Sequence, residues 1–397
     1  MKSRVLIAPD KFKGSLTATA VAEEIAMGLT DGPGDTSIEC ILLPLADGGD
    51  GSVDAALASG FHKHQFTVTG PTGQPVFATV AFDGDTALVE VANSCGIALL
   101  ASQSLAPLDA SSCGFGEAIL HALTLSPRRI VLALGGSAST DGGMGMLSVL
   151  GFTFRSPHGA VLQGSGRALH QIESVEMTPV PELQDVELVL ASDVHNPLFG
   201  TQGAAAIFGP QKGATPEQIA HLESGLVHFV SKLKEAGLDD SEERAGQSGA
   251  GSAGGIGFAC LLLGARQVSG AEFFLDLLKF DTYKQDCDII ITGEGSLDEQ
   301  TLAGKLPAAV ARRADGRPVV AVAGRSLLPT HRWSEMPIAQ VFALTQYTDL
   351  DSSRDGQLSR ELLREVGRDV RHFIQNLKSF VGSELEPLSP PAPVVRT

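Results

Sequence analysis

The sequence lacks several features that would each point to a particular class of protein. No apolar stretch approaches the roughly 20 residues of a membrane-spanning helix, and Pro9-Asp10-Lys11 ends the first apolar run too early for a signal peptide. The five cysteines show no C-x-x-C spacing, which predicts neither a zinc site nor a disulfide framework. We therefore expect a cytoplasmic protein whose cysteines are small buried residues in a reducing compartment.

Basic residues are also scarce. Lys and Arg total 29 against 46 Asp and Glu, so the 397-residue chain carries a net charge of −17. Nucleic acids and anionic membrane surfaces require a basic footprint, and the charge balance argues against both as main partners. The hydrophobic share of 43% is normal for a globular protein, and the length suits two or three domains with large buried cores.

Short, continuous apolar runs rich in Val, Ile and Leu predict strands that are buried on both faces, as in a parallel sheet. These runs lie at 5–8, 41–45, 130–134, 188–191, 289–291, 319–323 and 341–344. Helical patterns alternate with many of them, including a helix capped by Thr17 and helices at 307–313 and 358–380. The alternation predicts an α/β fold with right-handed crossovers.

One region departs from this rhythm. Residues 65–93 alternate like antiparallel strands, with turn signals at 70–73 and 83–85. The meander predicts a second, mixed α/β domain inserted into a Rossmann-like or flavodoxin-like parallel-sheet domain. We expect the parallel-sheet domain at 1–65 plus 285–382, the insert at 66–284, and a disordered proline-rich tail at 383–397.

Acidic residues and glycines follow five of the predicted strands. They occur in Pro9-Asp10-Lys11-Phe12-Lys13-Gly14, Asp47-Gly48-Gly49-Asp50-Gly51, Gly135-Gly136-Ser137-Ala138-Ser139-Thr140-Asp141-Gly142-Gly143, Asp193-Val194-His195-Asn196-Pro197 and Gly293-Glu294-Gly295-Ser296-Leu297-Asp298. In open parallel sheets, ligands bind beyond the carboxyl ends of the strands. Glycines there let backbone amides approach an anion, and carboxylates can hold Mg²⁺ or accept a proton. Each motif alone is explained equally well by turn or helix-cap chemistry, but their number favours a functional site.

Two further motifs do not meet the requirements of the sites they suggest. Residues 249–254 match G-x-G-x-x-G, but the polar, charged residues 241–248 before them predict no strand, so a dinucleotide site is not indicated. Lys305 follows Gly304, but Glu299 and Leu306 occupy positions that a Walker A sequence gives to other residues.

Taken together, the motifs resemble those of the bacterial type-1 glycerate kinase family. The resemblance runs in order from about residue 4 to about residue 380 and includes further motifs at 208–214, 249–255, 300–301 and 304–305. It implies ATP- and Mg²⁺-dependent phosphorylation of D-glycerate on two α/β domains with the cleft between them. The sequence departs from the family pattern in Ser112-Cys113-Gly114-Phe115-Gly116, at His195, where an acidic residue is common, and at Ser296, where a basic residue is usual.

The resemblance also implies roles for the residues at the strand ends. We expect Asp193 to accept the hydroxyl proton, with Glu294 and Asp298 as rivals, and Lys11 and Lys13 to meet anionic oxygens. The remaining predicted substrate contacts are Asp10, Asp47, Asn196 and Glu294, and Asp47 and Asp50 are the candidates for Mg²⁺. The predicted ATP-binding residues are Gly135, Gly136, Ser137, Gly142, Gly143, Gly251, Gly254, Lys212 and Lys305.

Within the resembled family, 2-phosphoglycerate is a better expectation for the product than 3-phosphoglycerate. Two alternatives stay open at this point: a kinase of another small hydroxy acid, and a catalytically silent α/β ligand-binding protein. The expected partners are D-glycerate and ATP, without nucleic acid or membrane, and a homo-oligomer is compatible with the sequence.

Overall fold

The computed structural model describes residues 2–31, 38–100, 104–178, 180–302 and 304–379. The chain divides into two compact units. Unit 1 comprises residues 1–47 and 271–397, and unit 2 comprises residues 48–270, so unit 2 interrupts unit 1 in the sequence. The tail expected at 383–397 lies outside the described residues.

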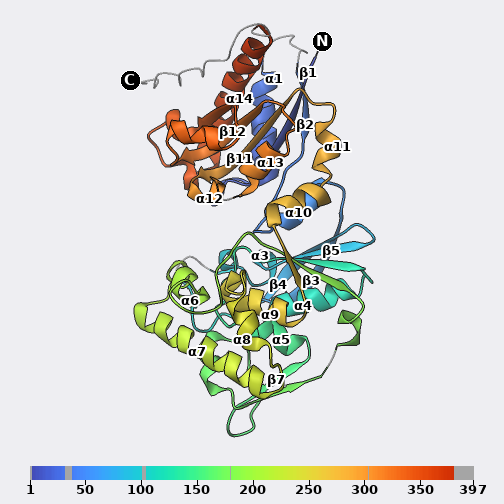
Figure 1. Cartoon of the computed structure of the whole chain (residues 1–397), viewed down its shortest axis with the longest axis vertical. Coiled ribbons are helices and arrows are strands. Elements are labelled where there is room, and N and C mark those ends of the chain that lie inside the picture. Colours follow the sequence, from blue (N-terminus) through green and yellow to red (C-terminus); the bar gives the residue numbers. More distant parts are fainter. Residues whose placement is uncertain (1, 32–37, 101–103, 179, 303, 380–397) are drawn as a thin grey trace. The chain divides into compact units, whose positions relative to one another are not determined.

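Unit 1 is built on a five-stranded parallel sheet (Figure 1). Its strands are β1 (Ser3–Pro9), β2 (Ile38–Leu42), β11 (Ile289–Leu297), β12 (Val319–Ser326) and β13 (Gln340–Ala343). The order across the sheet is β2-β1-β11-β12-β13, which is the 2-1-3-4-5 order of flavodoxin-like sheets. The predicted flavodoxin-like parallel sheet is therefore confirmed.

Helices cover both faces of this sheet. The helices of unit 1 are α1 (Ala18–Thr30), α10 (Gly270–Leu277), α11 (Phe280–Lys284), α12 (Glu299–Leu302), α13 (Leu306–Arg312) and α14 (Gly356–Ser379). On one face, Ile25 of α1 and Val366 of α14 share a core with Val322 of β12. Ala321 and Val341, which alternate with that core, form a smaller cluster on the opposite face.

Helix α1 shows why the sequence pattern predicted it correctly. The Thr17 hydroxyl accepts a hydrogen bond from the Ala20 amide at 3.2 Å, as expected of an N-cap. Two glycines then allow α1 to lie directly against α14. A Cβ at Gly28 would lie 2.2 Å from the Arg364 carbonyl oxygen, and one at Gly367 would lie 2.6 Å from that of Ile25.

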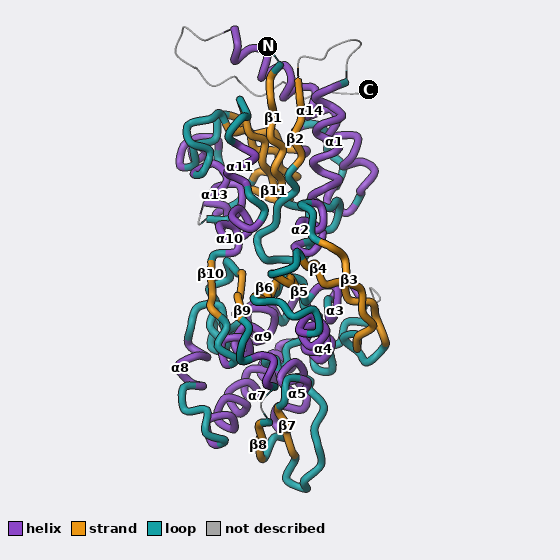
Figure 2. The backbone as a smooth tube through the Cα atoms, turned by 90° about the vertical axis from the view of Figure 1, so that its right-hand side faces the viewer, coloured by secondary structure: helices purple, strands orange, loops and turns teal. Residues whose placement is uncertain are grey.

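Unit 2 contains a six-stranded mixed sheet in the order β10-β9-β6-β5-β4-β3 and a separate antiparallel pair, β7-β8 (Figure 2). Its strands are β3 (His62–Thr69), β4 (Pro75–Phe82), β5 (Thr86–Glu90), β6 (Arg129–Ala133), β7 (Phe152–Arg155), β8 (Ser174–Met177), β9 (Glu187–Ala191) and β10 (Arg266–Val268). Its helices are α2 (Ser52–Ala58), α3 (Ala92–Cys95), α4 (Cys113–Leu123), α5 (Met144–Val149), α6 (Ala204–Phe208), α7 (Pro216–Glu235), α8 (Ser241–Gly246) and α9 (Ile256–Leu262).

The predicted meander forms β3, β4 and β5, which pair antiparallel. On its other side β5 pairs parallel with β6, and β6, β9 and β10 continue the parallel half of the sheet. The antiparallel hairpins thus extend a parallel sheet, which is the mixed architecture expected for the second domain.

The boundaries between the units differ from the expected ones at 65/66 and 284/285. Unit 2 begins at residue 48 because α2 packs on β4 and β5 of its own sheet. Unit 1 resumes at residue 271 because α10 and α11 are tied to it by ion pairs. Arg313, which follows α13, pairs with Asp276 and Asp281 on these helices.

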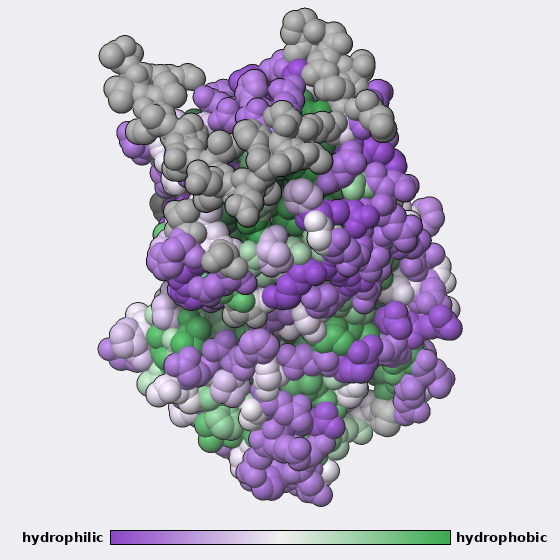
Figure 3. All heavy atoms as spheres, turned by 45° about the horizontal axis from the view of Figure 1, so that its top comes forward, coloured by the Kyte–Doolittle hydropathy of each residue, from purple (hydrophilic) through white to green (hydrophobic). Residues whose placement is uncertain are grey.

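The helices within the described ranges include none that is both long and apolar enough to cross a membrane. Figure 3 shows a face on which hydrophilic side chains predominate and apolar side chains gather in separate patches. All five cysteines lie within the described residues and are free thiols, and Cys95, Cys260 and Cys287 are buried, as expected.

A buried carboxylate ties α1 to α14 and yields a stability prediction. Glu24 is 2% exposed and accepts hydrogen bonds from Arg360, at 2.7 Å, and from Arg364. Burial would raise the pKa of Glu24, but the two arginines outweigh it and lower the pKa below its ordinary value. Its contribution to stability is therefore present above about pH 4.5 and is lost as the pH falls through the lowered pKa.

We expect Glu24→Gln to lower the free energy of unfolding by about 2 kcal/mol at pH 7, because charge-assisted hydrogen bonds are lost from a buried position. Urea denaturation measures this. The neighbouring exposed residue provides the control, since Glu23→Gln should change stability by less than about 0.5 kcal/mol. Equal effects of the two substitutions would contradict the assignment.

Candidate active site

The strand order of unit 1 reverses between β1 and β11, and this is where open α/β sheets bind ligands. Two predicted site residues lie at this point. Asp10 follows the last residue of β1, and its amide donates to the Gly293 carbonyl of β11 at 2.8 Å. Glu294, the next residue of β11, is 8% exposed. The register of the two strands therefore brings the Asp10 and Glu294 carboxyl groups to the same edge of the sheet.

Glu294 is held in an environment that favours its protonated form. Its pKa is raised to about 7, chiefly by burial, with smaller contributions from the carboxylates of Asp47 and Asp298. A hydrogen bond from the Thr301 hydroxyl to its carboxyl and the positive charge of Lys305 act in the opposite direction. Near neutral pH, Glu294 can consequently donate or accept a proton.

Asp10 shares this environment. Burial raises its pKa well above the ordinary value, and Asp47 adds repulsion, whereas Lys11 and its backbone amide lower the pKa. The Lys11 amide donates to the Asp10 carboxylate at 2.7 Å. Unit 1 thus places three predicted acidic residues, Asp10, Asp47 and Glu294, within electrostatic reach of one another.

The loop after β1 presents its lysines through a tight turn. Phe12 is buried, and its amide donates to the Leu16 carbonyl at 2.9 Å. The Leu16 amide donates in turn to the Phe12 carbonyl, also at 2.9 Å. Lys13 is exposed on this turn. Its backbone nitrogen lies 3.3 Å from where a Cβ of Gly295 would be, so the turn packs on the glycine next to Glu294.

Asp298 has a local structural role that the sequence also allowed. Its carboxylate accepts from the Gln300 amide at 2.9 Å, and its own amide donates to the Thr301 hydroxyl at 3.0 Å. These bonds cap the start of α12. They hold Asp298 beside Glu294, whose pKa it raises.

In unit 2, four loops, three of them rich in glycine, meet beside the carboxyl ends of β6 and β9. The loop at 48–51 packs on the loop after β6, where a Cβ at Gly135 would lie 2.5 Å from the Asp50 nitrogen. The Gly142 amide donates to the Gly254 carbonyl at 3.0 Å, and the Gly251 amide donates to the Asn196 carbonyl at 2.9 Å. The motifs at 48–51, 135–143, 193–197 and 249–255 are therefore neighbours, although they are far apart in the sequence.

Lys212 lies beneath these loops. It is 3% exposed, and its ammonium donates to the Ser137 hydroxyl at 2.9 Å and to the Ser139 carbonyl. Gly254 has a φ of +72°, and a Cβ there would lie 2.1 Å from the Ser139 carbonyl oxygen and 2.8 Å from the Lys212 Nζ, which together explain the glycine. Burial lowers the pKa of Lys212 to about 8, against the opposing effects of Asp141 and Cys95. The side chain thus binds the loops at 137–139 and 254 together from below.

Two acidic residues that sequence reasoning missed organise the same loops. Asp141 is fully buried and accepts from the amides of Gly143 and Gly145, both at 3.1 Å, and from the Ser112 hydroxyl at 2.7 Å. Glu90, at the end of β5, accepts from the amides of Gly51 and Val53 at the start of α2. Glu90 ends a buried strand and Asp141 lies in the loop after one, and this position was the signal in the sequence that could have identified them.

Asp193 and its neighbours form the loop after β9. The Asp193 carboxylate accepts from the Gly270 amide at 2.9 Å, and the Asn196 side chain donates to the Gln202 carbonyl at 2.8 Å. His195 is exposed and its Nδ1 lies 2.9 Å from the Ser248 hydroxyl. The side chains of all three therefore have partners within unit 2.

The departure at 112–116 forms the start of α4. A Cβ at Gly114 would lie 1.9 Å from the Thr69 carbonyl oxygen, and one at Gly116 would lie 2.7 Å from that of Met146. Phe115 is fully buried. The glycines of this segment therefore serve close packing, and burial raises the pKa of the Cys113 thiol to about 12, so that it is protonated near neutral pH.

The described ranges contain no group of three or more His, Cys, Asp or Glu side chains arranged to hold a metal ion. The two predicted Mg²⁺ residues belong to different units, Asp47 to unit 1 and Asp50 to unit 2. Magnesium at nucleotide sites commonly uses one or two carboxylates together with phosphate oxygens, and single carboxylates therefore still fit that role.

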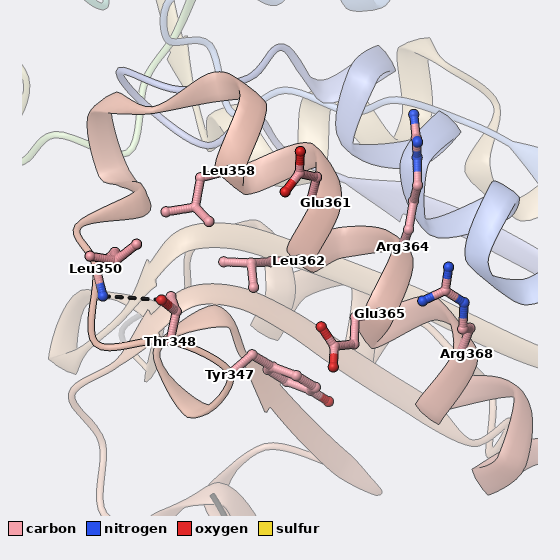
Figure 4. Close-up of a pocket in the computed structure, with 9 residues that line it drawn as sticks. All are labelled: Tyr347, Thr348, Leu350, Leu358, Glu361, Leu362, Arg364, Glu365 and Arg368. Atoms are coloured by element: carbon pink, nitrogen blue, oxygen red, sulfur yellow. Dashed lines mark hydrogen bonds between the residues drawn. The ribbon is translucent and has the colours of Figure 1, made fainter. Parts of the chain in front are cut away.

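A hollow of about 450 Å³ in unit 1 lies apart from the predicted residues (Figure 4). The segment after β13 and one side of α14 line it, including Tyr347, Leu350, Leu358 and Leu362. Of its two arginines, Arg364 is paired with Glu24 and Arg368 with Asp31. None of the lining residues is a predicted site residue, so this hollow adds nothing to the strand-end chemistry.

The raised pKa of Glu294 predicts a pH-dependent stability. The folded state keeps a proton on Glu294 up to about pH 7, whereas the unfolded chain loses it near pH 4.5. Stability should therefore fall as the pH rises from 4.5 to 7. We expect the Tm difference between Glu294→Gln and wild type, measured without ligands, to grow in favour of the variant between pH 5 and pH 8.

Each 1 kcal/mol corresponds to roughly 2–4 °C in Tm for a domain of 150–250 residues. Glu299→Gln is the control, because Glu299 is an exposed residue of α12 close by in the sequence. A Tm difference for Glu294→Gln that does not change with pH would show that Glu294 is ionised throughout.

Comparison with known proteins places these motifs in one family. Residues 5–375 match the model of the glycerate kinase family. A glycerate 2-kinase of Escherichia coli K12 is 38% identical over 329 residues, covering 81% of this chain and 85% of the relative. A glycerate kinase of Haemophilus influenzae is 40% identical over 328 residues, with the same coverage of both chains.

A solved structure agrees with this. A protein named as a glycerate kinase 2 from Salmonella typhimurium LT2 is 33% identical, with a TM-score of 0.78 over 96% of this chain and 100% of its own. Family model, sequence relatives and structure all span nearly the whole chain, and the chain belongs to the glycerate kinase family.

Proposed function

We propose that the protein transfers the γ-phosphoryl group of ATP to a hydroxyl group of D-glycerate and forms 2-phosphoglycerate. Membership of the glycerate kinase family supports the reaction class. The observation that carries the proposal is the gathering of the family's motifs at the carboxyl ends of the strands in both units. The name of the Escherichia coli relative, a glycerate 2-kinase, favours the 2-phospho product.

The reaction exchanges one phosphorus–oxygen bond for another. The glycerate hydroxyl oxygen bonds to the γ-phosphorus, the bond to the departing ADP oxygen breaks, and the hydroxyl proton passes to a carboxylate base. Catalysis of such a transfer is mainly positioning and neutralisation of negative charge. The protein therefore needs amides and cations for phosphate oxygens and one carboxylate near the hydroxyl.

Unit 2 offers the backbone amides. Its loops at 135–143 and 249–255 are held together by the Gly142–Gly254 bond and by Lys212 beneath them. We assign the nucleotide phosphates to these amides, because successive backbone N–H groups in glycine-rich turns bind anions. In this assignment Lys212 acts as a positioning residue, since its ammonium is committed to Ser137 and Ser139.

Unit 1 offers the cations and the protonated carboxyl. Lys13 is exposed on the turn that packs on Gly295, and we assign it to the transferred phosphoryl group. Glu294, with its pKa near 7, can hydrogen-bond a substrate hydroxyl as donor or acceptor. Lys305 adds positive charge next to it.

Asp47 and Asp50 are the residues that we assign to Mg²⁺. The repulsion that Asp47 exerts on Asp10 and Glu294 is the kind of unbalanced negative charge that a divalent cation relieves. When bound, the ion neutralises phosphate charge. Asp47, Asp50 or both would hold it through their carboxylates.

Turnover tests the proposal directly. We expect the wild type to release ADP in a coupled assay with D-glycerate, ATP and Mg²⁺, and phosphorus NMR to show 2-phosphoglycerate. Lys13→Ala should lower kcat about 100-fold, because a cation facing the transferred group is lost. Lys2→Ala, at another exposed lysine of unit 1, should leave kcat unchanged. Turnover of another hydroxy acid but not of D-glycerate would favour the alternative kinase.

A second comparison identifies the base. Asp193 of unit 2 and Asp298 of unit 1 both accept a hydrogen bond from a backbone amide, so these contacts do not separate them. We expect Asp193→Asn to lower kcat by 100-fold or more with little change in KM, because the loss falls on the transition state. Asp298→Asn should act mainly on α12 and leave kcat within about 10-fold. The reverse pattern would assign the proton transfer to Asp298.

A further inference from the structure

Arg325 lies at the carboxyl edge of the unit 1 sheet, and no sequence motif singled it out. It is the residue before the end of β12 at Ser326. Its register partner on β11 is Ser296. Its Nε donates to the Ser296 hydroxyl at 3.2 Å.

The contact with Ser296 uses only a small part of the hydrogen-bonding capacity of the guanidinium group. Arginine has five N–H donors, and the bond to Ser296 uses one of them. Arg325 is exposed and forms no ion pair with any acidic residue in the described parts of the chain. Arg332, Arg360 and Arg364, by contrast, are paired with carboxylates of unit 1. Arg325 is therefore not accounted for by a structural ion pair.

The surroundings of Arg325 are those of the predicted site. Ser296 and Glu294 are two residues apart on β11, so their side chains lie on the same face of the strand, and Arg325 joins that face through its register. Gly295, between them, faces the other side of the strand, where it packs against the Lys13 backbone. Arg325 thus shares one face of this strand end with Glu294, and the Lys13 turn lies on the other face.

We propose that Arg325 is an anion-binding residue of the active site, presented from β12 beside Ser296 and on the same face as Glu294 of β11. Neighbouring strands lie about 4.8 Å apart, a distance that the long arginine side chain spans easily. The Nε–Oγ bond to Ser296 is the observed sign that it does so. The inference rests on the proposed function and adds a residue to it.

The ligand chemistry is an oxyanion. The planar fork of arginine matches a carboxylate or a phosphate with two parallel hydrogen bonds. D-glycerate brings a carboxylate, and the glycine loops of unit 2 already offer amides for the nucleotide phosphates. We therefore assign Arg325 to the carboxylate of the hydroxy acid.

Kinetics and binding of Arg325→Gln test this. We expect the KM and the calorimetric Kd for D-glycerate to rise at least 10-fold, with those for ATP within twofold of wild type, since a charge-assisted bidentate contact is lost. An effect on ATP alone would contradict the carboxylate assignment and place Arg325 on a phosphate. Values within twofold of wild type for both substrates would overturn the proposal.

Arg354→Gln is the matched control. Arg354 is another exposed arginine of unit 1, and both it and Arg325 lower the pKa of Asp351, after the larger effect of the Ser353 hydrogen bonds. An effect that acts only through the charge near Asp351 would appear in both Arg325→Gln and Arg354→Gln. Equal changes of the KM for D-glycerate in the two variants would therefore contradict a direct contact of Arg325 with the substrate.

Moving the charge between the strands gives a second test. The double variant Ser296→Arg/Arg325→Ser places an arginine on β11 and a serine on β12 at paired positions. We expect it to recover most of the glycerate affinity that Arg325→Ser alone loses. A folded double variant no better than Arg325→Ser would overturn the exchange between strands.

Failure of this inference is separable from failure of the proposed function. A wild type that turns over D-glycerate, with Arg325→Gln unchanged, removes the role of Arg325 only. A wild type that neither binds nor phosphorylates D-glycerate removes the proposed function, and the carboxylate assignment falls with it.

Discussion

Parallel strands place all of their carboxyl ends at one edge of a sheet, and the chemistry of this protein depends on that constraint. Asp10 and Glu294 are 284 positions apart in the chain, yet the β1–β11 register sets them side by side. In unit 2 the same rule gathers the loops after β6 and β9 and the glycines at 249–255. Neither cluster would exist in an antiparallel sheet, where successive strands end at opposite edges.

Collecting charged groups at a sheet edge has an energetic cost, which the protein does not fully offset. Glu294 and Asp10 keep raised pKa values because burial and repulsion outweigh their hydrogen bonds. Lys212 is buried with a pKa near 8 even though it bonds to Ser137 and Ser139. Such unrelieved electrostatic stress is typical of sites that bind charged ligands. Glu24 on α1 shows the opposite case, because two arginines compensate the charge of this buried carboxylate.

Much of the fold could be predicted from residue patterns. The apolar runs at 5–8, 130–134 and 188–191 coincide with β1, β6 and β9, and Thr17 caps α1, because burial on both faces and cap chemistry leave strong local signals. The unit boundaries were harder to predict. Residues 48–65 read as a continuation of the first two βα units, and only packing of α2 on β4 and β5 assigns them to unit 2.

The site could be predicted in its residue types but less well in its local roles. Strand-end motifs indicated Asp10 and Glu294, and the family resemblance indicated Lys212, but burial of the Lys212 ammonium beneath the loops depends on tertiary packing that no motif encodes. Asp141 stood within a strand-end motif, but its role could not be assigned because its four hydrogen bonds reach the starts of two helices, α4 and α5. Arg325 was overlooked because its significance comes from strand register, which joins positions 296 and 325.

The interruption of unit 1 by unit 2 has a consequence for the order in which the protein is made. Residues 48–270 form a contiguous stretch that can complete its own sheet as soon as it leaves the ribosome. β1 must wait for β11, and α1 for α14 (Gly356–Ser379), both of which follow unit 2 in the sequence. The apolar side chains of α1, including Ile25 and Leu29, therefore stay without the partners that α14 supplies while more than 300 further residues are translated. We expect unit 1 to be the part of the nascent chain most dependent on protection from aggregation.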